Sequence, residues 1–185
     1  MANLQELLKA KSETILEHWF DLIIATYPAE SVQYFKRTKD AFQNPVGHTI
    51  HREMKAVFDE LLTGLDRERV SPFVDRIVRI RAVQDYAPSQ AVGFVLGLKQ
   101  VVRKALAKEL EAAAGARGLL DQLTDFESRV DELALIAFDI YMACRQKIYE
   151  IQAQEVKSMY YNVLRRADIL CPIPEQEEPD MPPEK

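Results

Sequence analysis

Two of the chain's three histidines lie three positions apart in the stretch FQNPVGHTIHREMKAVFDELLTG, residues 42 to 64. On a helix, His48 and His51 would have the spacing of two imidazoles that touch one metal ion, and either could be the axial ligand of a haem. Glu53 follows two positions later, whereas His18 is far away in sequence. Metal or haem binding is therefore the first chemistry to weigh.

The helical positions of these residues argue against such a site. A helix over residues 45–64 has its apolar face at Ile50, Met54, Val57, Phe58, Leu61 and Leu65. His48 lies about 130° from the centre of that face and His51 about 70° from it. Zinc or iron needs further ligands, and no cluster of Cys or His occurs elsewhere. We expect no metal and no cofactor, with a haem- or metal-binding globin relative using His51 or His48 as the alternative.

Motifs of reaction chemistry are also missing. The sequence contains no G-x-S-x-G, no phosphate-binding glycine loop, no C-x-x-C and no paired E-x-x-H. A small enzyme with a site made from His18, Asp85 and Tyr86 is the catalytic alternative, but these residues have no mutual spacing logic. We therefore expect no enzyme activity and no catalytic residue.

The stretch SQAVGFVLGLKQVV places Gly93 and Gly97 one helical turn apart, on either side of Phe94. A glycine inside a helix costs about 1 kcal/mol relative to alanine, so two of them need a reason. Close approach of another helix is the commoner one. Space for a small apolar ligand next to Phe94 is the alternative.

The elements that would position these residues are all helical. Only six glycines occur, and apolar residues recur every three or four positions without a strand-like alternation of useful length. Asn44 and Pro45 fit the N-cap and first position of a helix that ends at Gly64, and Ser71 with Pro72 repeats this pattern. About six helices are expected: residues 3–26, 30–41, 45–64, 71–84, 88–111 and 119–170. The sequence predicts an all-α bundle.

The last helix is too long for its domain. Its 52 residues would span roughly 78 Å, whereas a compact chain of this length has a radius of gyration of about 16 Å. Beyond Ile151 its apolar stripe narrows to Val156, Met159 and Val163, which is typical of a helix that meets a partner. We expect residues 119–170 to include a dimer or signalling helix, with folding back over the domain as the alternative.

Composition and charge exclude several classes of protein. The net charge is −5, of which residues 171–185 carry −4 (five acidic residues and one lysine), so the remaining 170 residues sit near −1 and offer no basic face for nucleic acid. No segment approaches the ~18 apolar residues of a membrane span, and the N-terminus lacks a signal-peptide pattern. The two cysteines, Cys144 and Cys171, suggest a reducing compartment. We expect a cytoplasmic protein with a folded domain over residues 1–170 and a disordered, acidic, proline-rich tail over residues 171–185.

Three stretches together resemble a known family: FQNPVGHTI (42–50), RIRAVQDYAPSQAVGF (79–94) and DELALIAFDIYMACRQKIYEI (131–151). In order and spacing they are similar to the N-terminal domain of RsbR/RsbRD-type RsbT co-antagonists. The resemblance covers roughly residues 4–165. It implies a globin-like helical sensor domain of bacterial stress signalling that binds no haem, dimerises and sends its last helix towards an output domain.

The sequence departs from that family pattern after the long helix, where only the acidic tail follows and no STAS output region is seen. The resemblance implies a stressosome-type sensory and regulatory module, and the departure implies that this module stands alone. Its expected partners are a second copy, proteins of a signalling pathway and an unknown small ligand.

Overall fold

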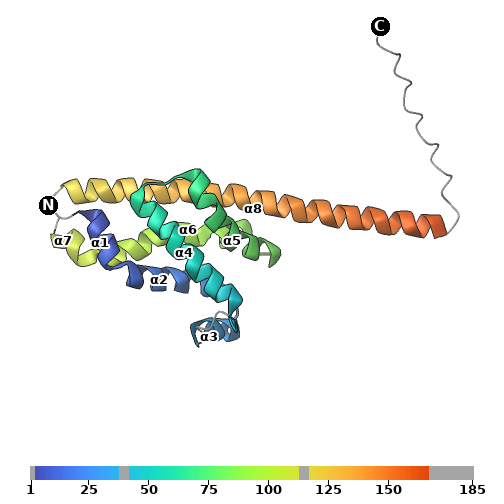
Figure 1. The fold of residues 1–185 in the computed structure, drawn as a ribbon, viewed down its shortest axis with the longest axis horizontal. Helices are drawn as coiled ribbons and strands as arrows, with labels where there is room; N and C mark the ends of the chain where they lie inside the picture. The colour runs from blue at the N-terminus through green and yellow to red at the C-terminus, as the bar shows by residue number, and fades with distance from the viewer. Residues whose placement is uncertain (1–2, 38–41, 113–116, 167–185) are drawn as a thin grey trace, which may run out of the picture. The chain divides into compact units, whose positions relative to one another are not determined.

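The computed structural model describes residues 3–37, 42–112 and 117–166, which are mostly helical (Figure 1). No strand occurs among them, and the C-terminal helix is the longest. The fold class expected from the sequence, an all-α bundle with a long C-terminal helix, is confirmed. The helices are α1 (Leu4–Ala10), α2 (Ser12–Ile24), α3 (Ala29–Arg37), α4 (Pro45–Thr63), α5 (Arg67–Val83), α6 (Pro88–Ala105), α7 (Ala107–Ala112) and α8 (Arg117–Arg166).

Two of the six expected helices are each divided by a single residue, which gives eight. Lys11 separates α1 from α2, and Leu106 separates α6 from α7. Backbone hydrogen bonds of the i to i−4 type nevertheless continue through both points, because Lys11 N–H donates to the Leu7 carbonyl at 3.1 Å and Leu106 N–H donates to the Val102 carbonyl at 2.9 Å. The expected helical runs are therefore present, with a local kink in each.

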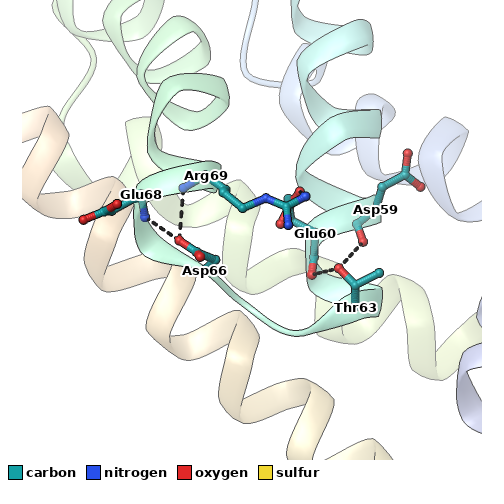
Figure 2. A network of polar contacts seen from close by, with 6 residues as sticks. All are labelled: Asp59, Glu60, Thr63, Asp66, Glu68 and Arg69. Carbon is teal, nitrogen blue, oxygen red and sulfur yellow. Dashed lines mark hydrogen bonds and ion pairs between the residues drawn. The ribbon is translucent and has the colours of Figure 1, made fainter.

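The start of α5 differs from the expectation at Ser71 and Pro72. The helix begins at Arg67, four residues after α4 ends, and Pro72 lies inside it. Asp66 is the N-cap, and its carboxylate accepts hydrogen bonds from the backbone N–H groups of Glu68 at 2.9 Å and Arg69 at 3.2 Å (Figure 2). The carboxylate cap at Asp66 satisfies the first N–H groups of the helix. Pro72 is then the sixth residue of the helix and cannot donate a hydrogen bond to the Glu68 carbonyl.

The core lies within the first compact unit of the chain, Met1–Gln146. Helix α2 packs against α1, α3, α4 and α6, and α4 packs along α5. The Trp19 side chain on α2 is fully buried, and its Nε1–H donates to the Phe94 carbonyl of α6 at 2.8 Å. A buried indole whose N–H has a partner fixes the spacing of these two helices.

Helix α8 has two different parts. Up to Tyr141 it buries one apolar side in the core, and Tyr141 is the last buried residue of the described chain. From Tyr149 to Arg166 every residue is exposed. Residues 167–170 and the tail over 171–185 lie outside the described residues. Within the described part, no helix has the length and apolar composition that crossing a membrane requires.

Candidate functional site

A pocket of about 520 Å³ lies among α2, α3 and the first turns of α4. Helix α3, which contributes Phe35 and Lys36, has no buried residue of its own, so it covers the pocket with few packing contacts. A pocket of this size is within the usual range for small ligands. It is lined by Glu17, Phe20, Asp21, Phe35, Lys36, Asn44, Gly47, His48 and His51.

Both histidines singled out in the sequence line this pocket. They lie in the first two turns of α4, whose N-cap Asn44 accepts a hydrogen bond from Gly47 N–H at 2.9 Å. Both side chains are exposed, and the His51 ring meets the Phe20 ring edge-on, with centroids 5.8 Å apart. The imidazoles are therefore at the wall of an open pocket, where they can donate or accept hydrogen bonds.

The charges around the pocket are mixed. Lys36 on α3 and Asp21 on α2 form an ion pair at 2.9 Å, which also ties α3 to α2. Glu17 and the two imidazoles are the other ionisable groups of the lining. Among residues 3–37, 42–112 and 117–166, no group of three His, Cys, Asp or Glu is placed to hold a metal ion. The lining suits a partly polar organic molecule that contacts the phenyl rings of Phe20 and Phe35.

A second pocket of about 470 Å³ lies on the other side of Phe35 and Asn44, which line both pockets. Tyr27, three residues after α2 ends, and Gln84, the C-cap of α5, also line it. The Tyr27 hydroxyl donates to Gln84 Oε1 at 2.8 Å. The pKa of Tyr27 is raised by its burial, an effect that the nearby Arg81 guanidinium opposes, so the hydroxyl stays protonated.

Arg81 is the most unusual side chain near these pockets, because it is fully buried at 0% exposure. Its guanidinium donates to the Ala91 carbonyl at 3.2 Å, the Gln90 carbonyl at 2.8 Å and Thr26 Oγ1 at 3.0 Å. Among the described residues no carboxylate is paired with it, and Nη1 has no hydrogen-bond partner there. Burial lowers the pKa of Arg81, but aromatic rings and carbonyl dipoles keep the cation stable.

The turn between α5 and α6 holds Asp85 and Tyr86, two members of the catalytic alternative. The Asp85 carboxylate pairs with Arg145 at 2.7 Å, and the Tyr86 hydroxyl donates to the Thr26 carbonyl at 3.2 Å. Neither is joined to His18 by a hydrogen bond or an ion pair. The structure therefore brings two of the three residues together, both in contacts that stabilise the turn.

Gly93, Gly97 and Phe94 have three different environments on α6. A Cβ atom added to Gly97 would lie 2.7 Å from Leu22 Cδ1 on α2, whereas one added to Gly93 would meet nothing within 4 Å. Phe94 is buried in the core, 6.1 Å from the Trp19 ring. Close packing of α2 is thus a geometric reason for Gly97 and gives none for Gly93.

Val156, Met159 and Val163, the expected partner contacts, are all exposed on α8. The structure shows two further exposed apolar residues earlier in α8, Leu135 and Met142. The sequence interpretation missed them because they occur where α8 is partly buried. Residues at seven-residue spacing are all large, apolar and between 47% and 68% exposed: Leu135, Met142, Tyr149, Val156 and Val163. A seven-residue apolar repeat is the pattern of a helix that pairs with another helix. We call these five residues the heptad strip.

Comparisons with known proteins agree with the three stretches noted in the sequence. A family model described as "RsbT co-antagonist protein rsbRD N-terminal domain" matches residues 13–156. An uncharacterized protein of Archaeoglobus fulgidus is 27% identical over 144 residues, which cover 76% of this chain and 82% of that protein. No solved structure matches the chain.

Proposed function

Since this chain belongs to the family of RsbT co-antagonist rsbRD N-terminal domains, we propose that it is a non-catalytic sensory and regulatory module that acts by contacting other protein chains. The heptad strip on α8 is the observation that carries this proposal. Five exposed, apolar side chains in a regular repeat lose water-exposed apolar area when another helix covers them.

A second copy of the chain is the partner that we propose for this strip. The side chains at the repeat are Leu, Met, Tyr, Val and Val, and the two valines are of the β-branched type found at the a positions of two-stranded coiled coils. Two identical helices also present the same repeat in the same register. Further signalling proteins would then bind to the dimer.

The first pocket described above, which lies among α2, α3 and the first turns of α4, is the proposed input site of the module, and we call it the α3 pocket. Its position is at the end of the bundle where α3 is weakly held, which allows a bound molecule to displace that helix. Phe20 and Phe35 would contact the apolar part of such a molecule, while His48, His51 and Glu17 would hydrogen-bond its polar part.

The dimer proposal is tested by sedimentation of charge variants. In Val156→Glu and Val163→Glu, two carboxylates would have to be buried in the seam, so the dissociation constant should rise at least about tenfold for each site. The matched controls Gln154→Glu and Ser158→Glu place the same charge on the opposite side of α8. A natural chain that is monomeric at all concentrations, or strip and control variants that behave alike, would contradict the proposal.

Haem binding is the second candidate, because His48 and His51 line one pocket together with two phenyl rings. The exposure of both imidazoles and the charged lining are a poor fit to a porphyrin, which needs an axial ligand in an apolar site. Titration with hemin distinguishes a haem-binding protein from the module proposed above, which binds no haem. A haem protein would give a sharp Soret band that His48→Ala or His51→Ala removes, whereas we expect only the broad spectrum of free hemin.

A further inference from the structure

A continuous series of aromatic contacts leads from the pocket to the turn between α5 and α6. The Phe35 ring on α3 lines the pocket and meets the Tyr27 ring edge-on, with centroids 5.0 Å apart. Tyr27 in turn meets Tyr86 edge-on at 5.7 Å. Such pairs have preferred geometries, so a displacement of one ring changes the position that the next ring prefers.

Arg81 fixes the middle of this series. Its guanidinium carbon lies 4.5 Å from the centroid of the Tyr86 ring and 5.9 Å from that of Tyr27. With no carboxylate among the described residues to neutralise it, the buried cation depends on these rings and on three oxygen acceptors. The positions of Tyr27 and Tyr86 are therefore tied to each other through one charged group.

The far end of the series holds α8. The Tyr141 hydroxyl donates to the backbone carbonyl of Tyr86 at 2.5 Å, and Arg145 Nη1 donates to the Ala82 carbonyl at 3.2 Å while pairing with Asp85 at 2.7 Å. Tyr141 and Arg145 are one helical turn apart, so the same side of α8 contacts the turn twice. These contacts lie just before the segment in which every residue is exposed.

The turn itself is backbone-strained. Asp85 has φ of 61°, and no other non-glycine residue in the described part of the chain has a positive φ. An aspartate tolerates this left-handed conformation but does not prefer it, so the contacts with Arg145 and Tyr141 keep the turn in its present form. Regulation through this turn requires a second, relaxed form that becomes accessible when those contacts weaken. Coupling between distant sites requires an element of this kind with two arrangements.

We propose that Phe35, Tyr27, Arg81 and Tyr86 form a relay through which the occupant of the α3 pocket controls how firmly the α5–α6 turn holds α8. The proposal rests on the sensory role given above and names its internal route. A molecule that moves Phe35 shifts Tyr27, then Tyr86 and Arg81, and finally the two contacts with Tyr141 and Arg145. The result is a change in the mobility of α8 where its buried part ends.

The test compares two pocket phenylalanines by amide hydrogen exchange of the full chain. Phe35→Ala and Phe20→Ala remove the same ring from the same pocket, but only Phe35 contacts Tyr27, since Phe20 contacts His51. Phe35→Ala should speed exchange in residues 84–87 and 142–146 by about threefold to tenfold, the size of effect expected from loss of one aromatic pair. Phe20→Ala should leave both segments within about twofold of the natural chain.

The relay is then cut in the middle. In a Tyr86→Ala background, Phe35→Ala should no longer change exchange in residues 142–146. This variant keeps the Tyr86 carbonyl that binds Tyr141 but removes the ring that contacts Tyr27. Tyr141→Phe should speed exchange there without affecting α3, because it removes only the last hydrogen bond. Persistence of the Phe35→Ala effect in the Tyr86→Ala background, or equal effects of Phe35→Ala and Phe20→Ala, would overturn the relay.

Loss of folding is separated from loss of coupling by Tyr27→Phe, which keeps the ring and removes only the hydroxyl that bonds Gln84. This variant should transmit the Phe35→Ala effect, and its failure to do so would count against a route through the rings. Sedimentation of the same samples reports independently on the proposed function. If the chain forms dimers but Phe35→Ala does not change exchange in residues 142–146, only the relay is contradicted. If Phe35→Ala changes this exchange in a monomeric chain, only the dimer proposal is contradicted.

Discussion

At the scale of single residues, the core contains two charged side chains that are stabilised in different ways. Arg81 depends on aromatic faces and carbonyl oxygens. Glu53, which is 2% exposed, is paired with Arg52 at 2.5 Å and with Arg76 of α5 at 2.7 Å. The two arginines are half-exposed, so Glu53 is an anion at the edge of the core whose partners reach it from solvent.

We expect Glu53→Gln to lower the free energy of unfolding by about 1–3 kcal/mol, because the amide cannot neutralise two guanidinium groups and one of its hydrogens faces them. Urea denaturation measures the loss. The control is Asp75→Asn, which breaks the exposed i, i+4 pair with Arg79 and should cost less than about 0.5 kcal/mol. Similar losses for the two variants would show that the burial of Glu53 is not important for stability.

Residue environments were the least predictable part of the structure. The position of Glu53 on the flank of α4 was visible in the sequence, but its burial depends on Arg76, which comes from α5. Likewise, helical geometry placed His48 and His51 away from the apolar face of α4, yet the pocket that they share also requires α2 and α3. Tertiary contacts of this kind leave no local periodic signal.

At the scale of elements, α6 offers a direct comparison of its two glycines. Replacing Gly93 with alanine adds a methyl group to open space, so the higher helix propensity of alanine should stabilise the fold by about 1 kcal/mol. Replacing Gly97 brings the same gain but forces Leu22 to move, since the new Cβ would lie 2.7 Å from its Cδ1. We expect Gly97→Ala to be at least about 0.5 kcal/mol less stable than Gly93→Ala.

Thermal unfolding of both variants measures this difference. Because Leu22 is 39% exposed and flexible, Leu22→Ala in the Gly97→Ala background should restore most of the propensity gain. Equal stabilisation at the two positions would mean that α2 and α6 do not approach each other as closely as the structure has them.

Helix positions followed well from the sequence where a cap or a proline marks the end. Asn44 with Pro45 and Pro88 begin α4 and α6 as expected. The start of α5 was wrong because Ser71 and Pro72 looked like a cap, while the stronger capping residue, Asp66, lies only two residues beyond Gly64 (Figure 2). A short link between helices allows two competing caps, and the carboxylate with two N–H partners prevails.

At the scale of the whole molecule, the fold class was predictable because a 3.6-residue apolar period runs through nearly the entire chain. The use of the last helix was only partly predictable. Its narrowing stripe was visible at Val156, Met159 and Val163, but the sequence did not mark Leu135 and Met142 as exposed, because they lie where α8 is partly buried. Sequence periodicity shows which residues of a helix are apolar and share a face. It does not show whether that face packs against the rest of the chain or stays exposed.

A chain shortened to end at Ile148 tests whether the residues that follow contribute to the stability of the core. All buried residues of the described chain lie between Leu4 and Tyr141, so this chain should unfold cooperatively, with a stability within about 1 kcal/mol of the full chain at high dilution. At higher concentration the full chain should gain several degrees in Tm, at about 2–4 °C per kcal/mol, because dimerisation stabilises it. The shortened chain should show no such concentration dependence in calorimetry.

The environment of Arg81 has a consequence for the conditions under which the protein can operate. A guanidinium, backbone carbonyls, a threonine hydroxyl and a tyrosine whose pKa is shifted upward neither gain nor lose a proton in mildly acidic or mildly alkaline medium. Passage of a signal through these groups would therefore not depend on their protonation in that range.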